Sequence, residues 1–251
     1  MFKRSIEENL KKWKMSISRK SLILRGARQV GKTSIVRKFA NENFGNLLEV
    51  NLEKIDQNNF FRNVSNVNDF IRRSEIITKT NITEGKTLLF IDEIQESLEV
   101  MKLLRFFAEE RPNLHLIVAG SLFEAKMSDE WSVPVGRVEY MYLYPMTFFE
   151  YLDAIGEENL KNNYEIGHEL LKKHLDNYLL VGGMPEAVLN FVKSNSFTQV
   201  QEIHERLLTS YTEDISKYAR ASDRKYLELI MDFGPKIAGQ IYKYENFGDS
   251  G

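Results

Sequence analysis

The sequence predicts an α/β fold in which helices cover a mostly parallel sheet on both faces and an all-α helical subdomain follows. The first observation is that short apolar runs alternate with longer segments of helical periodicity between residues 21 and 144. The second is that these runs are apolar throughout, which is typical of parallel strands buried on both faces. The third is that only helical patterns follow Pro145.

The composition is that of a globular chain. Hydrophobic residues make up 43% of the 251 residues and charged residues 28%, which argues against disorder and fibrous folds. The chain has no cysteine, which excludes a disulfide framework, a cysteine nucleophile and thiolate-bound zinc, and fits a reducing cytosol. The formal net charge of −2 argues against strong non-specific DNA binding by the whole chain.

The sequence predicts no membrane segment and no secretory signal. No run approaches the ~18 apolar residues that a membrane span needs. The N-terminal segment is basic, but Glu7 and Glu8 interrupt it and no apolar stretch follows. Ile6, Leu10 and Trp13 recur there at helical spacing and predict an amphipathic helix laid on the domain. We therefore expect a cytoplasmic protein with no membrane partner.

The same two patterns, runs that are apolar throughout and apolar residues at helical spacing, predict the individual strands and helices. Strands are predicted at 22–24, 47–52, 87–91, 114–119 and 138–144, and helices at 34–43, 60–78 (one helix or two) and 94–110. The last of these helices should end before Pro112, because proline cannot continue a helix. Further helices are predicted at 148–155, 160–181, 186–193, 197–218 and 226–233, with a break at 182–185.

The segment 26–33 reads Gly-Ala-Arg-Gln-Val-Gly-Lys-Thr and fits G-x-x-x-x-G-K-[ST] between a strand and a helix. The glycines let backbone N–H groups point inward at phosphates, and the helix N-terminus adds partial positive charge. Lys32, expected to face solvent without ligand, would reach the β- and γ-phosphates, and the Thr33 hydroxyl would ligate Mg²⁺. The alternative is a glycine-containing turn with an exposed lysine. The residues expected to bind nucleotide here are Gly26, Ala27, Arg28, Gln29, Val30, Gly31, Lys32, Thr33 and Ser34.

Asp92 and Glu93 follow the apolar strand 87–91, about sixty residues after the loop. A carboxylate at the end of a buried strand can hold the metal, which suits Asp92. Glu93 can face the γ-phosphate and orient or deprotonate the attacking water. The alternative for both residues is the N-cap of the following helix.

Two further polar residues lie beside predicted strands. Ser121 follows Gly120 at the end of strand 114–119 and could hydrogen-bond the attacking water or the γ-phosphate, or could cap a turn or helix. Arg137 precedes strand 138–144 and could stabilise charge on the transferring phosphoryl group, in cis or from a neighbouring subunit. A solvated edge arginine is the alternative for Arg137.

Residues 182–185 read Gly-Gly-Met-Pro between two predicted helices. A rigid proline after two glycines could place the ring of Pro185 flat against an adenine base. The alternative is a helix–helix turn. The guanine-selective pattern N-K-x-D does not occur in the sequence, which favours ATP over GTP.

Together these motifs resemble the prokaryotic AAA-like P-loop ATPases. The resemblance is carried by the runs at 26–33, 90–95, 136–138, 143–152 and 180–188. It implies a P-loop NTPase three-layer sandwich, with an additional strand between the Walker A and Walker B strands, followed by a helical lid. Family members continue into a winged-helix segment and a further domain, which implies that this chain is truncated at its C-terminal end.

The resemblance also implies an organisation and a set of roles. The ATPase core with its N-terminal helix would occupy 1–152, the helical lid subdomain 153–219, and the start of a truncated winged-helix-like segment 220–251. The residues with implied roles are Gly31, Lys32 and Thr33 for phosphate and metal, Asp92 for metal, Glu93 for catalysis, Ser121 as sensor and Pro185 for the base.

The function expected from these residues is slow, Mg²⁺-dependent ATP hydrolysis that drives movement of the helical lid and the C-terminal region. The alternative is a nucleotide-regulated DNA- or protein-binding module with little intrinsic turnover. Basic residues at Arg220, Arg224, Lys225 and Lys236 give it weak support, because acidic residues are interspersed among them. The expected ligands and partners are ATP or ADP, further copies of the chain, and a DNA or protein bound through the region beyond residue 251.

Overall fold

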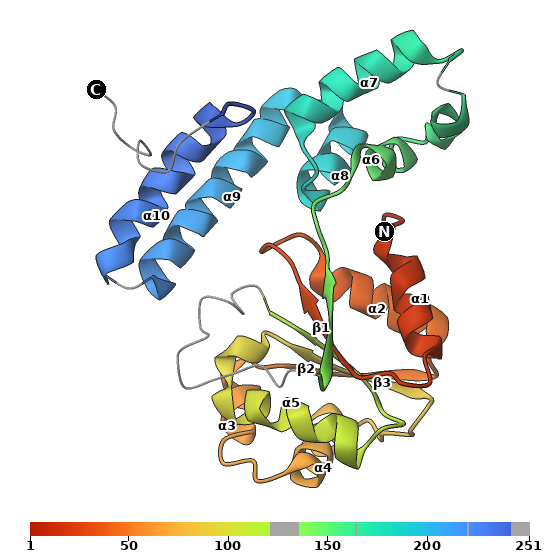
Figure 1. Ribbon diagram of the computed structural model, residues 1–251, viewed down its shortest axis with the longest axis vertical. Helices are drawn as coiled ribbons and strands as arrows, with labels where there is room; N and C mark the ends of the chain where they lie inside the picture. Colours follow the sequence, from red (N-terminus) through yellow and green to blue (C-terminus); the bar gives the residue numbers. More distant parts are fainter. Residues whose placement is uncertain (121–135, 164, 220, 242–251) are drawn as a thin grey trace. The chain divides into compact units, whose positions relative to one another are not determined.

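The computed structural model describes residues 1–120, 136–163, 165–219 and 221–241. Its centre is a sheet in the order β2-β3-β4-β1-β5, and each strand is parallel to its neighbours (Figure 1). The strands are β1 (Ser21–Arg25), β2 (Asn46–Asn51), β3 (Thr87–Asp92), β4 (His115–Ala119) and β5 (Val138–Tyr142). The predicted α/β fold with a parallel sheet is confirmed, and β4 lies between the two strands that lead to the predicted site.

Helices cover both faces of this sheet (Figure 1). One face packs on α1 (Ile6–Met15) and α2 (Lys32–Asn43). The other packs on α4 (Val67–Thr78) and α5 (Leu98–Glu110), with the short α3 (Ile55–Phe60) nearby. Every residue of β3 is buried, because apolar side chains meet it from both sides. This burial explains why the strand sequences are apolar throughout instead of alternating.

The chain forms two compact units, residues 1–197 and 198–251. The first contains the sheet, α1 to α5, and then α6 (Phe148–Ala154), the 3₁₀ turn η2 (Glu158–Asn162), α7 (His168–Val181) and α8 (Pro185–Ser194). The second contains most of α9 (Phe197–Tyr218), with α10 (Ala221–Phe233) and the 3₁₀ turn η3 (Gly234–Ile237). The predicted boundaries after residues 152 and 219 stay predictions. No helix in the described ranges is long and apolar enough to cross a membrane.

Side-chain caps account for two differences from the predicted helices. The predicted helix 94–110 is a 3₁₀ turn, η1 (Ile94–Glu96), followed by α5, because the Ser97 hydroxyl accepts from the N–H of Val100 at 3.3 Å and starts a new helix. The segment 60–78 holds the end of α3 and all of α4, which Asn66 caps by accepting from the N–H of Asp69 at 2.9 Å. The predicted helix 160–181 begins only with α7, and α10 begins before residue 226.

Candidate phosphate and base site

The turn between β1 and α2 has the backbone geometry of an anion-binding loop. Gly31 caps the N-terminus of α2 with a φ of 98°, a left-handed conformation that glycine adopts without steric cost. Gln29 also has a positive φ, 62°, which is uncommon for a residue with a Cβ. Because α2 starts at Lys32, its first N–H groups and the positive end of its dipole lie at this loop.

Lys32 lies inside the loop. Its side chain is buried, and Nζ donates to the carbonyl oxygens of Gly26 and Ala27, both at 2.9 Å. The prediction of a solvent-facing lysine is therefore wrong, because the loop's own carbonyl groups solvate the ammonium. Burial lowers the pKa of Lys32, and the carboxylates of Glu93 and Asp92 oppose this shift. The loop thus holds a positive charge within reach of two acidic side chains.

Thr33, at the start of α2, contacts Asp92, at the end of β3. The Thr33 Oγ1 donates to Asp92 Oδ2 at 2.7 Å, and the N–H of Glu93 donates to Asp92 Oδ1 at 3.1 Å. Asp92 is only 3% exposed, and burial raises its pKa although both hydrogen bonds lower it. The contact spans from the start of α2 to the end of β3, across the intervening β4. A hydroxyl and a carboxylate brought together are oxygen ligands of the kind that Mg²⁺ prefers.

Glu93 has a left-handed backbone conformation, with φ 51° and ψ 48°. Such conformations are uncommon in residues with a Cβ and often occur at functional sites. Gln95 Nε2 donates to Glu93 Oε2 at 2.5 Å. Gln95 is buried against Gly120, where an added Cβ would lie 2.3 Å from Gln95 Oε1. Sequence reasoning had not given Gln95 or Gly120 a role, and the predicted sensor, Ser121, lies outside the described residues.

Arg137 lies at the other end of the sheet from the loop. Val138, the first residue of β5, is in register with Ser21 at the start of β1, whereas the loop follows the end of β1. The length of β1, roughly 15 Å, therefore separates Arg137 from the loop. Its guanidinium pairs with Glu109 at 2.5 Å. This position excludes direct contact in cis between Arg137 and a phosphate in the loop, and a role in a neighbouring subunit stays a prediction.

A cavity of about 340 Å³ opens beside the loop. It is lined by the N-terminal segment, the start of α2 and the start of α8, namely Met1, Phe2, Arg4, Gly31, Ser34, Ile35, Pro185, Glu186 and Leu189. Pro185 is the first residue of α8, and its Cγ lies 3.8 Å from the point that a Cβ on Gly31 would occupy. The structure thus brings Pro185 and Ser34 to the predicted loop. The volume and the largely apolar walls are those of a small-molecule pocket.

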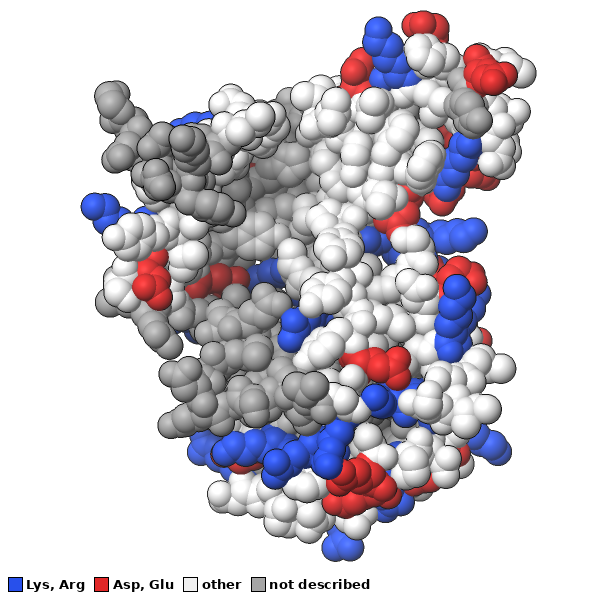
Figure 2. Space-filling view, viewed as in Figure 1, with Lys and Arg blue, Asp and Glu red and all other residues white. Residues whose placement is uncertain are grey.

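The charges on the surface are mixed. On the face in Figure 2, basic and acidic side chains are interspersed over the described residues. This pattern agrees with a formal net charge of −2. It differs from the continuous basic stripe that is typical of a nucleic-acid-binding surface.

Comparisons with known proteins point to one family. Residues 18–152 match the family described as the AAA domain, and residues 172–250 match a domain of unknown function (DUF8612). No curated protein matches the chain. The family match includes the loop, Asp92 and Glu93, whereas Arg4 and Pro185 lie outside it.

Solved structures with a similar fold have low sequence identity. The Thermotoga maritima RuvB Holliday junction branch migration motor is 17% identical with a TM-score of 0.47, over 93% of this chain and 78% of its own. A variant of the same RuvB gives the same values. Caenorhabditis elegans PCH-2 is 13% identical with a TM-score of 0.39, over 62% of this chain and 46% of its own.

Proposed function

This chain belongs to the AAA family of P-loop ATPases, and we propose that it binds ATP with Mg²⁺ and hydrolyses the bond to the γ-phosphate. One observation carries the proposal, the 2.7 Å hydrogen bond between the Thr33 hydroxyl and the Asp92 carboxylate. It joins the phosphate-binding loop to the strand end that bears both acidic residues. A strand–helix turn without a nucleotide role would not need a buried carboxylate at this point, because taking a charge out of water is costly even when it accepts hydrogen bonds.

The oxygen atoms of Thr33 and Asp92 fit a magnesium ion. Thr33 and Asp92 would hold the ion, and the ion would supply positive charge that stabilises the phosphates of the nucleotide. Among the described residues no cluster of three or more His, Cys, Asp or Glu side chains could hold a metal. The remaining ligands would therefore be phosphate oxygens and water, as is usual for Mg²⁺.

We expect the Lys32 ammonium to exchange its two carbonyl contacts for phosphate oxygens when nucleotide binds. Both acceptors, the carbonyl oxygens of Gly26 and Ala27, belong to the same loop, so the exchange needs only a side-chain rotation. Hydrogen bonds between two charged groups are stronger than those from an ammonium to a neutral carbonyl. The lysine is thus held at the loop before the phosphates arrive.

Glu93 is the proposed general base. Its carboxylate would take the proton of the water that attacks the γ-phosphorus, so that the leaving group is ADP and the products are ADP and inorganic phosphate. The hydrogen bond from Gln95 fixes Oε2 and hence the direction of the carboxylate. The strained backbone of Glu93 indicates that its orientation is imposed by the surrounding structure.

The cavity beside Gly31 is the proposed site for the adenine base. Phe2, Ile35 and Leu189 contribute apolar surface, and the Pro185 ring lies at the edge that faces the loop. Because Pro185 begins α8, a base bound here would touch the helical subdomain directly. This contact supports the further proposal that nucleotide state moves α6 to α8 relative to the sheet.

Calorimetric titration with Mg²⁺–ATP tests the proposal. We expect one ATP per chain for the parent, and a loss of affinity of about 100-fold or more for Lys32→Met, which removes a charge-assisted contact. Lys38→Met is the matched control, because Lys38 also lies on α2 but pairs with Glu7 at 2.8 Å. Unchanged ATP affinity in a folded Lys32→Met variant would contradict the assignment.

A further inference from the structure

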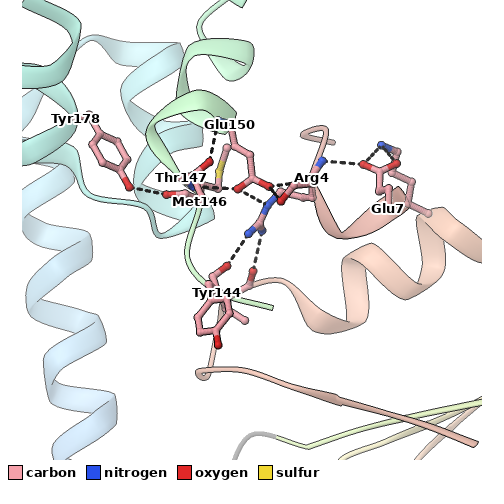
Figure 3. A network of polar contacts seen from close by, with 10 residues as sticks. Arg4, Glu7, Tyr144, Met146, Thr147, Glu150 and Tyr178 are labelled. Carbon is pink, nitrogen blue, oxygen red and sulfur yellow. Dashed lines mark hydrogen bonds and ion pairs between the residues drawn. The ribbon is translucent and has the colours of Figure 1, made fainter. Parts of the chain in front are cut away.

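We infer that Arg4 is a positioning residue for base recognition, and that it acts through a buried ion pair with Glu150. The inference rests on the proposed function, because it concerns the base end of the same nucleotide site. Arg4 lines the cavity, yet nothing in the sequence motifs points to it. In Figure 3 its guanidinium lies between the N-terminal helix, the chain after β5 and the start of α6.

The guanidinium of Arg4 joins three separate stretches of the chain. Its Nη2 donates to the carbonyl oxygen of Tyr144 at 2.6 Å, and Nη1 to that of Val30 in the phosphate-binding loop at 3.4 Å. Its Nε lies 3.2 Å from Glu150 Oε2 (Figure 3). Both charged side chains are 7% exposed. A lysine has no planar fork and could not make these three contacts together.

The carboxylate of Glu150 connects Arg4 to Ser5 and to the start of α6. Oε1 accepts from the N–H and the hydroxyl of Ser5 at 2.6 and 2.8 Å, and Oε2 accepts from the N–H of Thr147 at 3.0 Å. The Thr147 contact is half of a capping box that starts α6. Burial alone would raise the pKa of Glu150, but these hydrogen bonds and the Arg4 charge outweigh it, so the pKa is lowered. The carboxylate is therefore ionised at neutral pH.

Each member of the Arg4–Glu150 pair is connected to a different segment that lines the cavity. Arg4 belongs to the N-terminal segment, which supplies Met1 and Phe2 to the cavity lining, and its contacts hold this segment to Val30, Tyr144 and Glu150. Glu150 starts α6, which packs against α8, and α8 begins with Pro185, which also lines the cavity. One ion pair thus sets the separation of the two segments between which a flat base would lie.

Burying two charges is a poor way to gain stability. Replacing a buried ion pair by apolar residues of similar volume is often neutral or stabilising. A pair kept only for stability should therefore be replaceable in this way without loss of function. A pair that sets the cavity walls should not be, because Met side chains have no hydrogen bonds to direct the carbonyl groups of Val30 and Tyr144.

The test compares binding of Mg²⁺–ATP with binding of Mg²⁺–tripolyphosphate, which has the phosphates but no base. We expect Arg4→Met to weaken ATP binding by about 10-fold or more, the scale of loss when supporting contacts are removed, and tripolyphosphate binding by less than about 2-fold. The KM for ATP should rise by a similar factor while kcat changes little. Lys38→Met breaks the Lys38–Glu7 pair between α2 and α1 and leaves the side chains of Arg4 and Glu150 in place, so it should change neither ligand's affinity.

The double variant Arg4→Met/Glu150→Met separates positioning from stability. It removes both charges, so it should fold even if Arg4→Met alone, which leaves Glu150 buried without its cation, does not. We expect its thermal stability to be somewhat lower than that of the parent, because Ser5 and Thr147 lose the carboxylate that accepts from them, and its preference for ATP over tripolyphosphate to be lost. Recovery of ATP affinity together with stability would overturn the inference, as would an equal loss for both ligands. A parent that binds tripolyphosphate and ATP with the same affinity would also overturn it while leaving phosphate binding intact. A parent that binds neither would overturn the proposed function and the inference with it.

Discussion

The two ends of the candidate site differ in how far apart in the sequence their parts lie. The phosphate end is made by one continuous loop at 26–33 and by two acidic residues at the end of β3. The base end is made by the N-terminal segment, the start of α2 and the start of α8, more than 150 residues apart in the chain. The loop at 26–33 is built by local backbone geometry, and one tertiary contact, Thr33–Asp92, joins it to the end of β3. The base end exists only when tertiary contacts such as Arg4–Glu150 are formed.

Because of this difference, we expect substitutions at the two ends to change ligand affinity in different ways. Substitution of Lys32, at the phosphate end, should weaken binding of every ligand that has phosphates. Substitutions at the base end should affect ATP and spare tripolyphosphate.

Glu93→Gln should have the largest effect on turnover. It keeps the size of the side chain but removes the base, so kcat should fall by about 10²–10⁴-fold. Affinity for ATP should stay near the parent value, because the contact with the attacking water matters mainly in the transition state. Rapid-quench measurement of phosphate release, together with a binding titration, checks both parts. Hydrolysis at the parent rate would show that Glu93 does not act on the attacking water.

Gly120→Ala should lower kcat by a smaller factor, about 10-fold, because the added methyl group displaces the amide that orients Glu93. The new Cβ would lie 2.3 Å from Gln95 Oε1, so the side chain must move. The effect should disappear when Gly120→Ala is added to Gln95→Ala, which has no amide to displace. Equal losses in both backgrounds would assign the effect to residue 120 itself.

Pro185→Ala should weaken ATP binding by about 3–10-fold, since the ring loses two CH₂ groups and each contributes roughly 0.8 kcal/mol when fully buried. Tripolyphosphate affinity should not change. Leu189→Ala, at the same cavity but one helical turn further along α8, is the companion variant and should have a weaker effect. If both ligands lost affinity equally, the division between the two ends would be wrong.

Asp92→Asn should raise the thermal stability of the ligand-free protein by a few degrees, because ~1 kcal/mol shifts Tm by about 2–4 °C in a chain of this size. Burial raises the pKa of Asp92, so its ionised form is disfavoured in the folded state. A raised folded pKa means that stability is present below the unfolded pKa and is lost as pH rises through the folded pKa. The gain from Asn should therefore be largest at neutral pH and shrink towards acidic pH. Differential scanning fluorimetry across pH 4–8 checks this, and a gain independent of pH would contradict it.

The sequence predicted the sheet from local patterns, and it predicted which residues meet at the loop from the order of the strands. A strand buried on both faces must be apolar throughout, as β3 is. The glycines and Lys32 occupy adjacent positions in one turn, and strand ends on the same edge of a parallel sheet bring Asp92 to Thr33.

Other features depend on contacts that the sequence pattern does not encode. The direction of Lys32 is set by two carbonyl groups of its own loop. The distance of Arg137 from the loop follows from the parallel register of β5 with β1. The pairing of Arg4 with Glu150 joins residues that only the fold brings together, and neither lies in a recognisable motif.

Release of inorganic phosphate from Mg²⁺–ATP under single-turnover conditions tests the central claim most directly. With the parent chain in excess over ATP, we predict conversion of the bound ATP to ADP and phosphate, while Lys32→Met shows only the uncatalysed background. Single turnover allows for slow product release or for a partner needed for steady cycling. ATP that binds at one site per chain and is recovered intact over many hours would contradict the proposed hydrolysis and would favour a nucleotide-regulated binding module.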